Sequence, residues 1–151
     1  MKKFFTLILV LVGICSAQAA LIDFETANTD WQFVHTGQAN YWTIGTAAGS
    51  AAGGSKAMYV TSGGGYAYNE SSTSVSWACI PVIVNSQEAI SFDWKGATES
   101  CCDYVRVYLF PSYQLPTAGS NANGVSGVIS LSGNLTTASS WQNFSVTPTV
   151  D

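Results

Sequence analysis

Two carboxylates near the start of the chain, Asp23 and Glu25, have a spacing that suits a cation site. Residues two apart on a β-strand project to the same side, so both carboxylates would face one region of space. Hard cations such as Ca²⁺ need several oxygen ligands, and carboxylates are the strongest of them. The alternative is an ordinary solvated acidic face. A structural calcium ion held by Asp23 and Glu25 is therefore the first cofactor hypothesis.

Three other carboxylates, Asp93, Glu99 and Asp103, could supply the acid and base of a glycoside hydrolase if they met across a cleft. They flank two strand-like segments, however, where outward-facing polar residues are expected in any antiparallel sheet. His35 is the single histidine, and the sequence lacks the G-x-S-x-G turn that would expose a serine nucleophile beside it. We therefore expect a protein that is not an enzyme.

Three of the four cysteines, Cys79, Cys101 and Cys102, lie in the body of the chain. An odd number in a secreted protein leaves one thiol unpaired. The favoured disulfide joins Cys79 to one of the adjacent pair, which closes a loop of ~20 residues and adds about 3 kcal/mol. A bridge between the two neighbours is the strained alternative. A cysteine-ligated metal is disfavoured, because only His35 could complete the ligand set and no CxxC spacing occurs.

Aromatic residues are numerous, with five Trp, seven Tyr and seven Phe, and such rings can stack on the apolar faces of sugars. Tryptophans at alternating strand positions are better explained as core residues, since a sandwich needs bulk there. Tyrosines in loops or on outward faces are the better ligand candidates. The residues predicted to bind a ligand are Tyr66, Tyr68 and Tyr113.

The candidate residues lie on or between short segments of alternating polarity. The clearest segment spans residues 88–110, where two alternating runs, 90–95 and 104–110, flank a connection at 96–100. A period of two indicates half-buried antiparallel strands, here two strands joined by a hairpin-like connection. The turn-rich remainder predicts an all-β fold, an antiparallel jelly-roll β-sandwich. Further strand candidates cover residues 21–25, 31–35, 41–45, 57–62, 74–80, 127–131 and 141–146.

The chain begins with the pattern of a secretory leader. Lys2 and Lys3 precede a largely apolar run from Phe4 to Ile14, and Ala17-Gln18-Ala19 is a small-x-small cleavage signal. The run is shorter than the ~20 residues that a membrane-spanning helix needs. We therefore predict a signal peptide at residues 1–19 and a single domain at residues 20–151, secreted or held at the cell surface.

The charge balance of this domain argues against two classes of partner. All nine carboxylates remain after cleavage, but only three cations do, namely Lys56, Lys95 and Arg106. Nucleic acids and anionic lipids are bound through clusters of basic residues, which are absent from the sequence. We expect no nucleic-acid partner and no membrane span once the leader is removed.

Short motifs follow one another along the chain in an order that resembles a known family. They are D-F-E at 23–25, Trp31, Y-W-T-I-G at 41–45, M-Y-V-T-S at 58–62, P-V-I at 81–83, I-S-F-D-W-K at 90–95 and D-Y-V-R-V-Y-L at 103–109. This order resembles the choice-of-anchor J and cleaved-adhesin domains of secreted bacterial proteins, which are jelly-roll modules similar in shape to MAM domains. The likeness extends from residue 21 to about residue 146.

The resemblance implies a non-catalytic module that binds extracellular glycan or protein, as adhesins do. The alternative is an accessory domain of a secreted peptidase whose catalytic part lies outside this chain. In such domains the glutamate of the opening F-E often binds a structural calcium, which favours Glu25 over Asp23. Two strands and an acidic residue usually follow a strand like 140–146, and the sequence ends without them at Asp151. The resemblance therefore also predicts a domain truncated at its C-terminus.

Overall fold

The computed structural model describes residues 22–26, 30–51, 53–99 and 101–149, so the predicted signal peptide at 1–19 lies outside the described residues. Within these ranges the protein contains β-strands and turns but no helix, and every strand pair is antiparallel, which confirms the all-β prediction. No helix of the described part is long and apolar enough to cross a membrane. The strands are β1 (Gln32–Val34), β2 (Tyr41–Gly45), β3 (Ala57–Thr61), β4 (Trp77–Cys79), β5 (Ile90–Gly96), β6 (Tyr108–Leu109), β7 (Ile129–Ser130) and β8 (Ala138–Val146).

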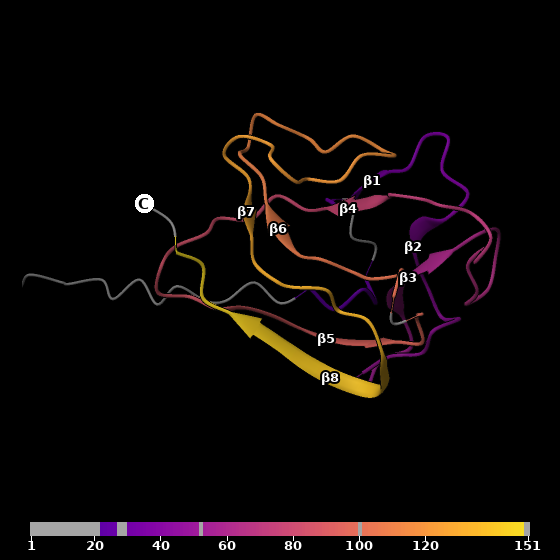
Figure 1. Ribbon diagram of the computed structural model, residues 1–151. Coiled ribbons are helices and arrows are strands. Elements are labelled where there is room, and N and C mark those ends of the chain that lie inside the picture. The colour runs from indigo at the N-terminus through magenta and orange to yellow at the C-terminus, as the bar shows by residue number, and fades with distance from the viewer. Residues whose placement is uncertain (1–21, 27–29, 52, 100, 150–151) are drawn as a thin grey trace, which may run out of the picture.

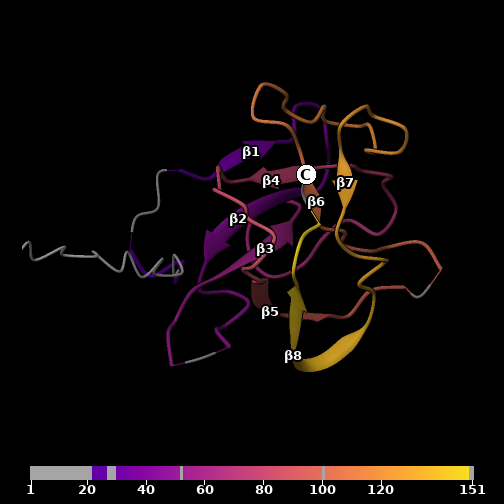
Figure 2. The ribbon, with the colours of Figure 1, turned by 90° about the vertical axis from the view of Figure 1, so that its left-hand side faces the viewer.

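The eight strands form four two-stranded sheets, paired as β1–β4, β2–β3, β5–β8 and β6–β7 (Figure 1). Both views place the β5–β8 sheet at one side of the molecule. The long segment between β6 and β7 lies at the opposite side (Figures 1 and 2). The described residues thus establish small antiparallel sheets, whereas the closed jelly-roll arrangement stays a prediction.

The predicted hairpin within residues 88–110 is wrong in its pairing. The first run forms β5 as expected, but β5 pairs with β8, in the register Phe92 to Phe144. The second run contributes only the short β6, which pairs with β7, and an isolated bridge from Val105 to Leu135. An alternating pattern determines which face of a strand is buried and leaves open which strand lies beside it. The tight turn after β5 sends the chain to a different partner.

The predicted first strand, residues 21–25, is also wrong over residues 22–25, the part of it that the structure describes. The Asp23 carboxylate accepts hydrogen bonds from the backbone N–H groups of Glu25, at 3.1 Å, and Thr26, at 3.5 Å. Phe24 has a φ of 58°, in the left-handed region that non-glycine residues rarely adopt. An aspartate that bonds to its own backbone two residues onward forms an Asx turn, which competes with extended structure. The segment therefore turns, and Asp23 and Glu25 do not share a strand face.

Few side chains of the described residues are fully buried, and those that are buried are small. Ala48, Ala57 and Ala122 are buried, together with the polar Asn40 and Thr61. Most of the larger rings are half-buried, and several of them pack against one another in pairs. One such pair, Phe92 and Phe144, joins β5 to β8 with ring centroids 5.0 Å apart. Aromatic pairing and buried polar anchors therefore contribute much of the stabilisation.

Candidate functional site

The Glu25 carboxylate is bound by the backbone that leads into β3. Its oxygens accept hydrogen bonds from the Ser55 N–H at 2.6 Å, the Ser55 hydroxyl at 2.9 Å and the Lys56 N–H at 2.7 Å. The Lys56 ammonium donates to the Glu25 carbonyl at 3.1 Å. These donors stabilise the charged carboxylate, and the Lys56 and Ser55 backbone bonds are the main causes that lower the pKa of Glu25. Glu25 therefore fastens the N-terminal segment to β3.

The two predicted calcium ligands are not brought together by the structure. Asp23 is engaged in its own turn, whereas Glu25 faces the start of β3. Among the described residues, neither belongs to a group of three metal-ligating side chains close enough to share one ion. Calcium binding at Asp23 and Glu25 stays a prediction, and the contacts seen here give Glu25 a second role as a structural anchor.

Replacing Glu25 with glutamine should lower the free energy of unfolding in EDTA at neutral pH, because an amide lacks the charge that strengthens the three hydrogen bonds. A carboxyl with a lowered folded pKa stabilises the protein above its unfolded pKa, and this stabilisation is lost as the pH falls through the folded pKa. Urea denaturation from pH 7 to pH 3 should therefore show a steeper decline for the wild type than for the variant. Equal slopes would contradict the anchoring role. A calcium-dependent rise in Tm that the variant lacks would support the ion separately.

The three predicted ligand tyrosines have different environments. Tyr66 is 47% exposed and lies edge-on to Tyr59, with ring centroids 6.1 Å apart. Tyr68 donates its hydroxyl to Asp103 at 2.8 Å, and burial together with this hydrogen bond raises the pKa of Tyr68 to about 12. Tyr113 is 85% exposed and belongs to the segment between β6 and β7. Figure 1 shows this segment on the side of the molecule away from β8. Of the three, Tyr66 is the one with contacts to side chains of the β5–β8 sheet.

Five side chains around β5 and β8 form a continuous polar and aromatic surface, which we call the β8 face. The Lys95 ammonium lies 4.8 Å from the centre of the Trp141 ring and 5.6 Å from the centre of the Tyr66 ring. Beside them, the Asn143 amide donates to the Asp93 carboxylate at 3.0 Å. The β8 face thus combines two aromatic rings, one cation, one carboxylate and one amide.

The register of β5 and β8 explains why these residues meet. Asp93 is directly opposite Asn143, and side chains two apart along a strand point to the same side, so Lys95 shares the face with Asp93. The register shifts between Trp94 and Gly96, where β8 contains extra residues. Such bulges redirect side chains and are frequent beside binding sites. Trp141 lies in this irregular stretch and contacts Lys95.

An open, shallow depression of about 620 Å³ adjoins the β8 face. Successive residues of β8 line it, so it follows the strand rather than one of its faces. This volume lies within the range of sites that hold small ligands. Asn143 belongs both to the depression and to the β8 face. The lining residues are Trp94, Leu135, Thr137, Ala138, Ser139, Ser140, Gln142, Asn143 and Phe144.

Sequence reasoning did not identify Lys95, Trp141 or Asn143 as binding residues. The strand pattern of 141–146 was visible, but the pattern does not show that this strand pairs with β5. The available signal was compositional: a strand containing Trp, Gln and Asn with no charged residue is unusual for an exposed sheet edge. Only the pairing shows which residues of β5 these side chains adjoin.

The residues considered for catalysis have separate partners. Asp93 binds Asn143, and Asp103 binds Tyr68. Glu99 lies in the turn after β5, and its carbonyl accepts two backbone hydrogen bonds. His35 stacks on Tyr41 with ring centroids 5.0 Å apart. That the protein is not an enzyme remains an expectation.

The expected disulfide from Cys79 is wrong. The structure joins Cys101 to Cys102 and leaves Cys79 as a half-buried thiol whose pKa is raised by burial. The favoured pairing needs Cys79 to lie beside one of the two adjacent cysteines. In the structure Cys79 lies on β4 and is opposite Gln32 of β1. The fold therefore gives Cys79 no disulfide partner among the described residues.

Comparisons of this chain with protein-family models, with curated proteins and with solved structures found no match. The resemblance to choice-of-anchor J and cleaved-adhesin domains stays a prediction, and a function must be inferred from the geometry of the site itself.

Proposed function

We propose that this protein is a secreted, non-catalytic module with a jelly-roll fold that binds extracellular glycan at the β8 face. The observation that carries the proposal is the arrangement of Lys95 between the rings of Trp141 and Tyr66, next to the Asp93–Asn143 pair. A sugar ring presents an apolar C–H face and a rim of hydroxyl groups. The β8 face offers a matching surface for each.

The aromatic rings would supply the stacking surface. Tyr66 is partly exposed, and its T-shaped contact with Tyr59 restricts its orientation. Rings that are already held in place lose little conformational entropy when a ligand binds, which favours affinity. Lys95 is held over both rings by cation–π attraction, worth roughly 0.5–1 kcal/mol at an exposed site. The rings and the cation are therefore arranged before a ligand arrives.

The polar groups would supply the hydrogen bonds. Lys95 makes no hydrogen bond or ion pair within the described residues, so its ammonium protons remain available to a ligand. The other two cations are engaged, because Lys56 donates to the Glu25 carbonyl and Arg106 donates to Asn134. Asp93 and Asn143 keep acceptor and donor positions beyond their mutual bond. Lys95 can therefore donate to sugar hydroxyls or to a sugar carboxylate.

Glycan-array screening followed by calorimetry on the best ligand tests the proposal. We expect Trp141→Ala to weaken binding by about tenfold or more, equivalent to about 1.4 kcal/mol. Tyr66→Ala should weaken it by a similar factor. Tyr104→Ala is the matched control, because Tyr104 has the same 47% exposure as Tyr66 and lies outside the β8 face. Far-UV circular dichroism and Tm establish that each variant is folded.

Three outcomes would count against the glycan proposal. One is unchanged affinity in a folded Trp141→Ala variant, and another is an equal loss in Tyr104→Ala. The third is absence of glycan binding together with saturable binding to an extracellular matrix protein, which would support the protein-binding role instead. If Trp141→Ala is unstable, Trp141→Phe and Tyr66→Ala decide the question. Tyr113→Ala tests separately whether that predicted tyrosine takes part.

A further inference from the structure

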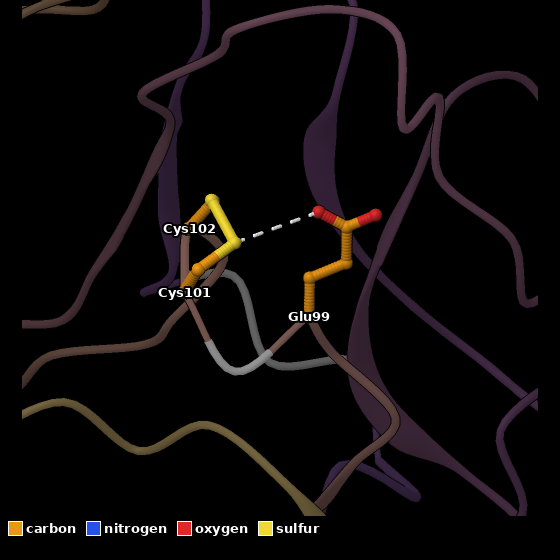
Figure 3. A group of neighbouring side chains, drawn as sticks. All are labelled: Glu99, Cys101 and Cys102. Carbon is orange, nitrogen blue, oxygen red and sulfur yellow. Dashed lines mark hydrogen bonds between the residues drawn. A yellow bond between two sulfur atoms is a disulfide. The ribbon is translucent and has the colours of Figure 1, made fainter.

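Three potential metal-binding side chains cluster in the turn that follows β5. A carboxylate oxygen of Glu99 and the sulfur atoms of Cys101 and Cys102 all lie within 4.8 Å of one another, and all three residues are exposed. Figure 3 shows the Glu99 carboxylate directed toward the two sulfur atoms. This cluster is the only such group of three or more among the residues that the structure describes.

The disulfide between Cys101 and Cys102 closes this cluster to metal ions. Metals bind the thiolate form of cysteine, and a sulfur in a disulfide carries no such charge. The 3.9 Å contact between Cys101 Sγ and a Glu99 carboxylate oxygen, dashed in Figure 3, involves a sulfur that has no proton to donate. In the oxidised protein, Glu99 and the two sulfurs are thus neighbours without being ligands of a common atom.

We propose that this turn is a redox-gated site for a thiophilic divalent cation of the Zn²⁺ or Cd²⁺ type. An external dithiol supplies two electrons and two protons, so that the Cys101–Cys102 bond breaks to two thiols while the dithiol becomes a disulfide. The cation then binds both sulfurs and releases their two protons to solvent. Glu99 provides the third ligand and water the fourth, which completes the four-coordinate geometry common for such ions.

Backbone hydrogen bonds keep the main chain of Glu99 close to that of Cys102 without help from the disulfide. The N–H groups of Cys102 and Asp103 both donate to the Glu99 carbonyl, each at 3.3 Å. The Asp103 carboxylate is in turn held by the Tyr68 hydroxyl. None of these bonds involves a sulfur atom, so they can persist after reduction. Reduction should therefore free the sulfurs while the main chain of Glu99 stays in place, so that its carboxylate remains within reach of them.

The environment of the turn favours a soft cation over a hard one. Two sulfur ligands select thiophilic metals, whereas Ca²⁺ requires a shell of oxygen ligands. Exposure of all three side chains gives both the reductant and the ion access. Exposed disulfides are also the ones that external thiols reduce most readily. The site is independent of glycan binding, since none of its three residues belongs to the β8 face.

Cadmium titration of the full chain tests the proposal, because Cd²⁺ bound to thiolate absorbs in the ultraviolet. The background is the double variant Cys15→Ser and Cys79→Ser, which leaves Cys101 and Cys102 as the two cysteines of the sequence. After reduction with a phosphine and desalting, we expect saturable binding of one Cd²⁺ per chain with a thiolate absorption band. The oxidised protein should show no band. Cys101→Ser and Cys102→Ser should abolish the band. Glu99→Gln should keep the band but weaken the affinity for Cd²⁺ by about tenfold.

Several results would overturn the inference. An equal band in the oxidised protein would show that the disulfide does not gate the site. Absence of saturable binding after verified reduction would remove the site altogether. Unchanged affinity in Glu99→Gln, or equal affinity in urea-unfolded protein, would show that two adjacent cysteines bind Cd²⁺ without the folded turn. Thiol titration and Tm of each reduced variant exclude incomplete reduction and unfolding as causes.

Discussion

Trp77→Ala should lower the free energy of unfolding by about 3 kcal/mol. This value is at the lower end of the range measured when a large core aromatic is removed, because Trp77 is only half-buried. Trp77 lies on β4 and packs on Tyr108 and Phe110, with ring centroids 5.8 and 5.6 Å apart. Its indole N–H donates to the Thr117 carbonyl at 3.1 Å. The ring also lines a cavity of about 80 Å³. Its removal would enlarge this cavity and detach the segment after β6. Urea denaturation measures the change.

Two phenylalanine variants separate ring packing from the hydrogen bond. Trp77→Phe keeps most of the packing but leaves the Thr117 carbonyl without its donor, a loss of about 1 kcal/mol. Trp31→Phe is the matched control, because the Trp31 indole nitrogen is buried and has no hydrogen-bond partner among the described residues. Removing this N–H should change the free energy of unfolding by less than about 0.5 kcal/mol, or should increase it. The explanation fails if both variants lose the same stability.

Asn40→Ala should also be strongly destabilising, by about 3 kcal/mol. Asn40 is only 7% exposed, and its side-chain amide makes two hydrogen bonds to the backbone of Asn69. The amide oxygen accepts from the Asn69 N–H at 2.7 Å, and the amide nitrogen donates to the Asn69 carbonyl at 3.0 Å. Its own N–H donates to the Ser74 hydroxyl at 3.2 Å. Alanine would remove both hydrogen bonds to the Asn69 backbone, each worth about 0.5–1.5 kcal/mol, so about 3 kcal/mol is the upper end of the expected loss.

The same substitution should weaken glycan binding, because Asn40 fixes the end of the segment that carries Tyr66. Asn85→Ala is the matched control: Asn85 accepts one backbone bond from Gln87 in an exposed turn, at 2.8 Å. We expect this variant to lose less than about 0.5 kcal/mol. Thermal and urea denaturation give the stabilities, and calorimetry gives the affinity. Equal losses in the two variants would show that burial of Asn40 is not the cause.

Local sequence patterns predicted several strands with nearly correct bounds. Residues 41–45 were predicted and found as β2, and the predicted strand at 57–62 is found as β3 over Ala57–Thr61. Each is a short run rich in aromatic and β-branched residues, and turn-forming residues lie beside it. The segment at 21–25 failed because the Asp23 side chain can bond to its own backbone. This hydrogen bond competes with extended structure, and the alternation of polar and apolar residues does not reveal it.

The candidate site was predicted less completely than the strands. Tyr66 was identified because it is an aromatic residue in a loop, and the structure places it against Lys95. Trp141 and Asn143 were not identified, because their place in the proposed binding site depends on the pairing of β8 with β5. The disulfide was predicted wrongly for a similar reason, because the sequence does not show which cysteines the fold brings together. In each case the sequence shows the type of the residue but does not show which distant residue lies beside it in the fold.

The sequence alone therefore determined the all-β class, the positions of most strands and the turn segments between them. These properties follow from interactions within a few residues: side-chain alternation, turn propensity and the absence of helical periodicity. Only the tertiary structure decided that β5 pairs with β8, that Cys101 joins Cys102 and that Lys95 lies between Trp141 and Tyr66. Several antiparallel partners satisfy one alternating pattern equally well, so the choice among them depends on packing between residues far apart in the chain.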